Sequence, residues 1–301
     1  MTALSRRGLL AGAAAALAAS LVPRGLRARA SAPDPDHDRL DAWTADLRAE
    51  GLCRAAVPLG RAAVRVGELA AGTPYVAQTL EAYLAAGGRA DREPLTLSLT
   101  RFDCVTLVEA CLAVARAAGG GDPSRWERFA REVERMRYRG GERAGYASRL
   151  HYFSEWIADG ERRGLVRDLG SELGGREDAR PLRFMTEHRG SYPALAAEAV
   201  FREIGTIERG LDARPRRVVP AARIAEVAHR IETGDVLAFA TSIPGFDVTH
   251  SALAHRGDDG VLRVLHAPLS GGVVEVTRAT LPEYVAAIRR ATGILVARPL
   301  R

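Results

Sequence analysis

One cysteine in this sequence has the position of a reactive thiol. Cys104 follows Arg101-Phe102-Asp103 and opens an apolar run that predicts a helix over 103–118. A thiol at a helix N-terminus lies near unsatisfied backbone N–H groups and the positive end of the helix dipole, and both stabilise thiolate. Cys104 is therefore a candidate nucleophile, and the alternative is a thiol that packs as a small apolar side chain.

The other two cysteines are expected to be ordinary packing residues. Cys111 lies seven residues after Cys104, which is about 10.5 Å along a helix that rises 1.5 Å per residue. A disulfide needs Cα atoms within about 7 Å, so the two cannot pair inside one continuous helix. Cys53 and Cys111 are predicted to pack as small apolar side chains.

Two histidines fall in consecutive predicted strands. The runs 248–254 and 261–266 read as strands and flank a turn centred on Asp258. An antiparallel pair that is symmetric about Asp258 places His250 directly opposite His266 on one face of the hairpin. Two imidazoles are therefore expected side by side.

The same face of this hairpin carries small apolar residues, on which we expect the helix over 103–118 to pack. These residues are Ala252, Ala254, Leu262 and Val264. Such packing would bring Cys104 to His250, with His266 behind it as the orienting group. His250 would then hold the thiolate as an ion pair and protonate a leaving amine. His255 is on the opposite face, and we expect it to be exposed.

The two histidines have other possible roles. They could form a half-buried polar pair or supply two ligands to a metal ion. A zinc site needs a third ligand, and none stands at a recognisable spacing, so we predict no metal and no cofactor. All 43 basic residues are Arg, and Lys and Asn are absent, which excludes a Schiff-base lysine and a catalytic asparagine.

The elements that must position these residues change along the chain. Residues from about 40–232 show mostly helical patterns, with an isolated strand predicted at 94–99 and a long surface loop at 165–190. Short strand-like runs dominate 234–301. Helices followed by a mostly antiparallel sheet are typical of the α+β class. We find no linker and no repeat, and predict a single catalytic domain over 31–301.

Residues 1–30 predict an export signal. Arg6-Arg7 precede an apolar run over 8–22, and Ala28-Arg29-Ala30 has the small-x-small pattern of a cleavage site. The paired arginines resemble a twin-arginine signal, and an uncleaved membrane anchor is the alternative. We expect a mature protein that begins near Ser31, has no stable membrane span, and is periplasmic or secreted.

The net charge gives no reason to expect a nucleic acid as partner. The chain carries a formal charge of +6, but five arginines and no acidic residue lie in the first 30 residues. The remainder holds 38 Arg against 37 acidic residues. A nearly neutral domain lacks the positive field that binds phosphate backbones.

Several segments resemble a known family. Arg101 to Thr106 (RFDCVT), with His250 and with His266 sixteen residues on, resemble the NlpC/P60 cysteine peptidase superfamily. Tyr146 to Ile157 (YASRLHYFSEWI) and Gly245 to His250 (GFDVTH) resemble more closely its DUF1460 family, described as N-acetylmuramoyl-L-alanine amidase-like. The likeness runs from about Tyr75 to Arg298.

The resemblance implies a papain-like α+β fold and cleavage of the amide bond between N-acetylmuramic acid and L-alanine in peptidoglycan fragments. It also implies that Cys104 is the nucleophile, His250 the base and His266 the third member. A stem-peptide endopeptidase and a non-catalytic muropeptide-binding protein of the same fold are the alternatives. Val105 stands where many NlpC/P60 endopeptidases have Ser, which weakens any transfer of their specificity.

Five further residues are candidates for contact with a muropeptide, whose carboxylates and sugar junction suit arginine, polar and aromatic partners. They are Asp103, Arg149, His151, Tyr152 and Asp247. Asp103 could instead cap the helix, and its negative charge opposes formation of a thiolate at Cys104. Arg149 could form an ordinary surface ion pair, and Tyr152 could be a core residue.

Overall fold

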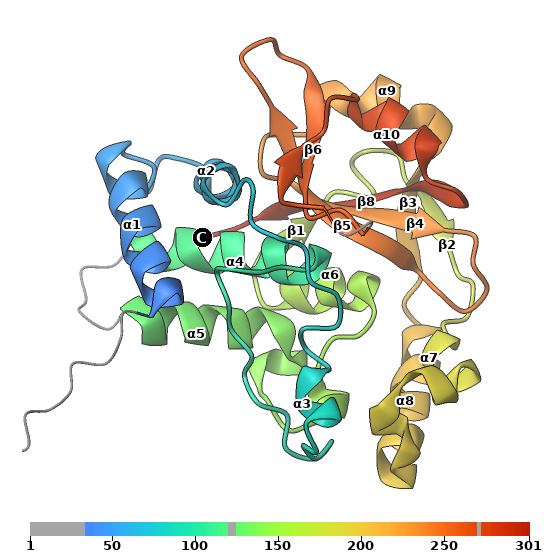
Figure 1. The fold of residues 1–301 in the computed structure, drawn as a ribbon. Coiled ribbons are helices and arrows are strands. Elements are labelled where there is room, and N and C mark those ends of the chain that lie inside the picture. The colour runs from blue at the N-terminus through green and yellow to red at the C-terminus, as the bar shows by residue number, and fades with distance from the viewer. Residues whose placement is uncertain (1–33, 120–124, 270–271) are drawn as a thin grey trace, which may run out of the picture. The chain divides into compact units, whose positions relative to one another are not determined.

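The computed structural model describes residues 34–119, 125–269 and 272–301. The predicted export signal over 1–30 lies outside these residues. The described chain is α+β, with helices packed against an antiparallel sheet of eight strands (Figure 1), so the predicted class is confirmed. Within these ranges no helix has the length and apolar character needed to cross a membrane.

The described chain has the following elements. The α-helices are α1 (Pro35–Ala49), α2 (Leu59–Leu69), α3 (Ala82–Ala85), α4 (Cys104–Ala118), α5 (Arg125–Arg137), α6 (Phe153–Arg162), α7 (Phe184–Glu187), α8 (Glu198–Leu211), α9 (Ile224–Val227) and α10 (Leu281–Ala287). The strands are β1 (Val166–Asp168), β2 (Arg176–Asp178), β3 (Arg216–Pro220), β4 (Val236–Thr241), β5 (Val248–Arg256), β6 (Leu262–His266), β7 (Glu275–Val276) and β8 (Ala291–Pro299).

The sheet has the order β2-β3-β8-β4-β5-β6-β7, and β1 pairs with β8 beside this path. Strands β1, β2 and β3 come from the half predicted to be helical, so the predicted division at residue 234 is wrong for them. Two of them, β1 and β2, also lie in the predicted loop over 165–190. These two are short and polar, and they exist because β8 and β3 offer edges to pair with.

The strand predicted at 94–99 is absent. These residues form neither a helix nor a strand and have no sheet partner. Their alternation arises because Leu95, Leu97 and Leu99 pack on the large apolar cluster around α4. A period of two therefore reflects packing of alternate side chains on one cluster here, without a strand ladder.

The two faces of the sheet are covered by different helices (Figure 1). Leu253 and Leu265 pack in the cluster that contains the buried side of α4. The neighbours predicted to receive this helix instead pack with α9 and α10; they are Ala252, Ala254, Leu262 and Val264. The predicted face is therefore wrong, because strand alternation shows which residues share a face but not which helix covers it.

The register of the β5-β6 hairpin also differs from the prediction. Ala254 pairs with Val264 and Arg256 with Leu262, which centres the turn on Asp259 rather than on Asp258. Asp259 fixes this turn by accepting hydrogen bonds from the Val261 amide and from Arg263. A shift of two residues leaves every side chain on its predicted face.

Candidate active site

The two histidines meet on the α10 side of the sheet. His250 of β5 and His266 at the end of β6 are diagonal neighbours, and 2.9 Å separates His250 Nε2 from His266 Nδ1. Both residues are only 3% exposed. The predicted adjacency of the imidazoles is confirmed, although they are not directly opposed in the ladder.

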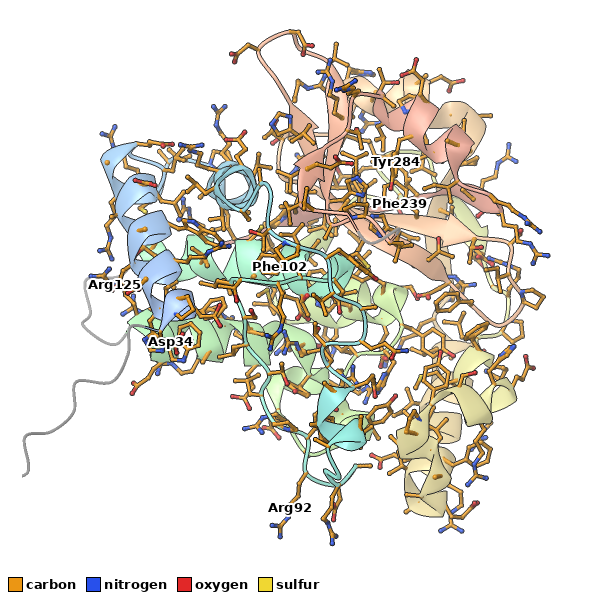
Figure 2. The ribbon with its side chains drawn as sticks, viewed as in Figure 1. Asp34, Arg92, Phe102, Arg125, Phe239 and Tyr284 are labelled. Carbon is orange, nitrogen blue, oxygen red and sulfur yellow. The ribbon has the colours of Figure 1, made fainter. Side chains whose placement is uncertain are left out.

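Aromatic rings enclose this pair. Phe239 of β4 stacks on His250 with 5.6 Å between ring centroids. Tyr284 of α10 places its hydroxyl 3.2 Å from His266 Nδ1. Figure 2 labels Phe239 and Tyr284 close together, between the sheet and the helices that cover this face. The pair is therefore largely shielded from water.

Burial keeps both imidazoles neutral. Loss of hydration lowers the pKa of His250 to about 3, and the nearby His266 adds to this effect. Burial likewise lowers the pKa of His266 to about 4. At neutral pH each ring therefore has one N–H and one bare nitrogen.

Cys104 is the first residue of α4 and is half-buried. Burial raises the pKa of its thiol to about 11, and the negative charge of Asp103 raises it further. The Ser251 backbone, the Ser251 hydroxyl and the Val105 amide lower that pKa by less. Burial thus favours the neutral thiol, and these pKa shifts do not support the predicted thiolate–imidazolium pair with His250.

The thiol lies at a gap in the sheet. The Ser251 backbone, which lowers the pKa of Cys104, belongs to β5. The pairing of β5 with β6 begins only at Leu253. A thiolate at Cys104 would also raise the pKa of Tyr284, the residue that contacts His266. Cys104 thus approaches the open edge of β5 next to His250, although no hydrogen bond joins it to either histidine among the described residues.

Asp103 acts as a helix cap. Its Oδ1 accepts hydrogen bonds from the Thr106 amide and from the Thr106 hydroxyl, each at 2.8 Å. Thr106 Oγ1 in turn accepts from the Asp103 amide at 2.9 Å. This reciprocal capping fixes the start of α4, so the structure supports the capping alternative for Asp103.

Arg149 is a buried structural residue rather than a surface ion pair. Its guanidinium lies 2.5 Å from Glu81 and 3.1 Å from Glu93, and it stacks over Tyr146 at 4.8 Å. These carboxylates raise its pKa despite burial. Two acidic partners already neutralise Arg149, so this geometry does not support the predicted contact with a substrate carboxylate.

Three other predicted binding residues also hold the fold together. The Tyr152 hydroxyl is buried and donates to Glu208 at 2.6 Å. Asp247 is buried and accepts from the Ser154 amide at 2.8 Å. His151 Nε2 lies 2.9 Å from the Tyr146 carbonyl oxygen, and burial lowers its pKa well below the usual value. Satisfied contacts of this kind do not support substrate binding.

His255 was expected to be exposed and is half-buried instead. It does lie on the opposite face from His250, as alternation predicts. There it meets α2, and its Nε2 is 3.0 Å from Glu68. The packing of α2 over this end of the hairpin explains the difference.

Three residues around the candidate site carry no signal in the sequence. Ser251 lies beside the thiol, Tyr284 beside His266, and Tyr75 close enough to Cys104 for a thiolate to raise its pKa. An isolated β-bridge between Tyr75 and Phe102 holds Tyr75 near Cys104. No local pattern marks Tyr75 or Tyr284, because long-range packing places both.

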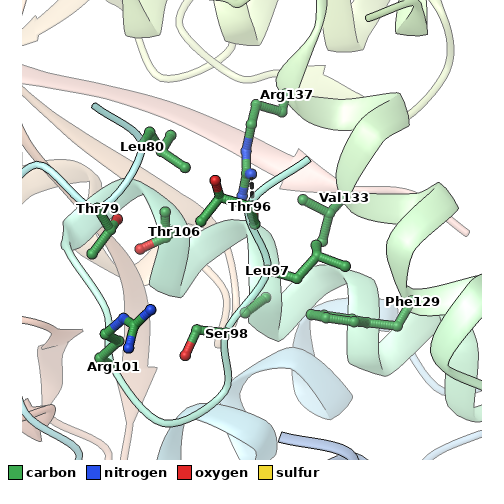
Figure 3. A pocket seen from close by; sticks show the side chains of 11 residues that line it. Thr79, Leu80, Thr96, Leu97, Ser98, Arg101, Thr106, Phe129, Val133 and Arg137 are labelled. Carbon is green, nitrogen blue, oxygen red and sulfur yellow. Dashed lines mark hydrogen bonds between the residues drawn. The ribbon is translucent and has the colours of Figure 1, made fainter. Parts of the chain in front are cut away.

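A cavity of about 570 Å³ opens beside the histidines. Its walls include His250, His266, Glu275, Arg278 and Tyr284. Another cavity, near the start of α4, measures only about 20 Å³ and lies around Thr106 and Arg101 (Figure 3). The larger space can take part of a ligand, whereas the smaller has room for about one water molecule.

The described residues contain no group of three histidine, cysteine or acidic side chains that could hold a metal ion. The imidazole nitrogens that face each other, His250 Nε2 and His266 Nδ1, are in mutual contact. They therefore do not converge on a common point as two ligands of one ion would.

Comparison with known proteins decides the family. A family model described as N-acetylmuramoyl-L-alanine amidase-like (AmiA-like) matches residues 65–294. The chain belongs to this amidase-like family. The amidase-like resemblance stated from the sequence is therefore confirmed, and one solved structure of similar fold carries the DUF1460 assignment.

Solved structures share the fold of this amidase-like chain. An N-acetylmuramoyl-L-alanine amidase from Bacteroides uniformis is 30% identical with a TM-score of 0.72, covering 81% of this chain and 99% of its own. A Bacteroides fragilis protein named as a candidate xylanase is 32% identical, with a TM-score of 0.70, and the match covers 77% of this chain and 99% of that protein. Protein LPG0564 from Legionella pneumophila is 17% identical, with a TM-score of 0.63 over 88% and 94%. Among curated proteins, none matches the chain.

Proposed function

We propose that this protein is an exported cysteine hydrolase of papain-like, NlpC/P60 type that cleaves the amide bond between N-acetylmuramic acid and L-alanine in peptidoglycan fragments. The observation that carries the proposal is a thiol at a helix N-terminus against Ser251, which follows His250 of a neutral imidazole pair, in a chain of the amidase-like family. Cys104 is the nucleophile, His250 the base and His266 the residue that orients it.

The free atoms of the site fit these roles. His250 Nδ1 is buried and has no hydrogen-bond partner, so its lone pair is available to a proton. The backbone N–H groups of Cys104 and Val105 start α4, where helical partners are missing. Such donors stabilise the negative oxygen that forms when a carbonyl carbon is attacked.

The proposed reaction has two halves. The Cys104 thiol gives its proton to His250 Nδ1 while sulfur attacks the lactyl carbonyl carbon. The C–N bond then breaks, the peptide amine takes the proton from His250, and the muramoyl group stays on sulfur as a thioester. Water next gives a proton to His250 and its oxygen attacks the thioester, which releases the sugar acid and returns the proton to the thiol.

A neutral thiol and a neutral imidazole make this mechanism depend on proton transfer during attack. The pKa of Cys104 lies above neutrality and that of His250 lies below it. In such a pair the imidazole acts as a general base and takes the thiol proton while sulfur attacks. This occurs once the substrate carbonyl has displaced water from the site. Resting thiolate is then not required.

Digestion of a defined muropeptide tests the proposal. Purified protein without residues 1–30 is incubated with N-acetylmuramoyl-tripeptide, and the products are weighed by mass spectrometry. The proposal predicts free N-acetylmuramic acid and an intact peptide that begins with L-alanine, with no product from Cys104→Ala. Cleavage inside the stem would identify an endopeptidase, and binding without products would identify a muropeptide-binding protein; either result overturns the proposal.

A glycosidase activity has less support. Glycosidases generally use two carboxyl groups that flank the scissile bond. Among the described residues that line the cavity beside the histidines, Glu275 is the single carboxylate. The xylanase name of the Bacteroides fragilis relative therefore has no matching feature in this cavity.

The proposed location also has a direct test. Paired arginines ahead of an apolar run support export through the twin-arginine route. A reporter fused after Ala30 is expected outside the cytoplasm, and Arg6→Gln with Arg7→Gln is expected to retain it inside. Unchanged export in the double variant would refute the twin-arginine route.

A further inference from the structure

The contact between the imidazoles contains a third polar group. His266 Nδ1 lies 2.9 Å from His250 Nε2 and 3.2 Å from the Tyr284 hydroxyl oxygen. The Tyr284 and His266 rings meet edge to face, with 5.2 Å between their centroids. One nitrogen atom therefore serves two polar neighbours.

This nitrogen can serve both neighbours well only as an acceptor. A neutral imidazole has one N–H and one bare nitrogen. If His266 Nδ1 is bare, the Tyr284 hydroxyl and His250 Nε2–H can both donate to it. If it carries the hydrogen, that single hydrogen would have to be shared between His250 and Tyr284, which weakens both contacts.

The outer nitrogens favour the same assignment. His250 Nδ1 and His266 Nε2 are both buried without a hydrogen-bond partner. With His266 Nδ1 bare, His250 Nδ1 is an unused acceptor, and His266 Nε2–H has Glu275 Oε1 at 3.8 Å. Either assignment leaves one outer N–H without a hydrogen bond, but an N–H on His266 lies near a carboxylate, whereas one on His250 Nδ1 has no such partner.

We propose that Tyr284 is a positioning residue that sets the tautomer of His250. Its hydroxyl donates to His266 Nδ1, which keeps that nitrogen bare and thereby keeps the hydrogen of His250 on Nε2. The Glu275 carboxylate faces the Nε2–H of His266 and favours the same state. The catalytic consequence of this tautomer rests on the proposed function. His250 Nδ1 is then already bare, and can accept the proton of the Cys104 thiol, before substrate binds.

Nitrogen NMR of labelled histidine tests the tautomers without any turnover, because bare and protonated ring nitrogens have different shifts. His266→Gln and His250→Gln assign the signals. We expect bare Nδ1 atoms on His250 and His266 in the wild type, and a mixture of tautomers in Tyr284→Phe. A hydrogen on His250 Nδ1 in the wild type, or a Tyr284→Phe spectrum like that of the wild type, would overturn the proposal.

Kinetics supply a second readout. Tyr284→Phe keeps the ring and is expected to lower kcat about fivefold, the effect of one ordinary hydrogen bond, with KM unchanged. Tyr83→Phe is the matched control, because that hydroxyl is 3.5 Å from Glu93 and forms no contact with the imidazoles. A higher KM at unchanged kcat would make Tyr284 a substrate contact and overturn the positioning role. If the amidase reaction itself is absent, the wild type shows no turnover, while the spectra still decide the tautomer.

Discussion

Two buried polar clusters in this molecule differ in charge. Around Arg149, two carboxylates and the ring of Tyr146 surround the guanidinium, and the Tyr138 hydroxyl donates to Glu93 at 3.0 Å. Around His250 and His266 the groups are neutral, and each ring keeps one buried nitrogen without a partner.

This difference separates structural from reactive groups. A buried charge needs partners to offset its desolvation, and once paired it has little left to offer a ligand. A neutral imidazole with a bare nitrogen keeps a lone pair that can accept a proton from a reacting group. The candidate residues predicted from the sequence therefore fall into two groups. Arg149 is held in structural ion pairs, whereas the histidines keep nitrogens that can take part in a reaction.

The largest expected effect is loss of activity in Cys104→Ala. Removal of a nucleophile lowers kcat by at least about 10³-fold, whereas the thermal midpoint is expected to change little because Cys104 is half-buried at a helix end. Amidase assays and thermal unfolding measure the two quantities. Cys111→Ala, also on α4 and fully buried, is the control and is expected to keep activity. Equal activity in the two variants would remove Cys104 from the site.

Arg149→Met tests the other cluster. Loss of the guanidinium leaves Glu93 buried without its ion-pair partner, so the free energy of unfolding is expected to fall by about 3 kcal/mol. Urea denaturation measures this change, and kcat of the folded fraction should stay near the wild-type value. Arg89→Met removes an exposed ion pair with Asp91 and is expected to leave the denaturation midpoint unchanged. A kcat that falls with intact stability would restore Arg149 as a substrate-binding residue.

Acid should destabilise the histidine cluster. The pKa of His250 is about 3 in the folded protein and near 6.5 in an unfolded chain. Between these values the unfolded chain binds a proton that the folded chain excludes, so stability falls as the pH drops below 6.5. For His250 alone the loss at pH 5 is about 2 kcal/mol. Urea denaturation at pH 7 and pH 5 measures it, and His250→Gln should lose less on acidification.

A smaller effect is expected from Asp103→Asn. Asparagine still caps a helix, but the variant removes the negative charge that raises the pKa of Cys104. The thiolate fraction at pH 8 should rise about threefold, which corresponds to half a pKa unit. The rate of alkylation by iodoacetamide, followed for the Cys104 peptide, measures this change. An unchanged rate would show that Asp103 does not act on the thiol.

The sequence was sufficient for the parts of the fold that local patterns govern. Apolar runs and a capping residue predict α4, and alternation predicts β5 and β6 to within a few residues. The adjacency of His250 and His266 follows because an error of two residues in register preserves the face of every side chain.

Long-range packing governs what the sequence did not predict. Strands β1 and β2 are polar and form only by pairing with β8 and β3. The side of the sheet that α4 covers, and the burial of Arg149 between two carboxylates, depend on contacts among distant segments. Tyr284 reaches His266 only because α10 folds back over the sheet, and no local spacing encodes that.

The relation between modification of Cys104 and loss of amidase activity tests the central claim most directly. Protein is treated with iodoacetamide for increasing times at pH 8.5, residual cleavage of N-acetylmuramoyl-tripeptide is measured, and peptide mapping gives the modified fraction of each cysteine. The account predicts that activity falls in proportion to the fraction of Cys104 modified and reaches zero when that modification is complete. Full modification of Cys104 with activity retained would contradict it.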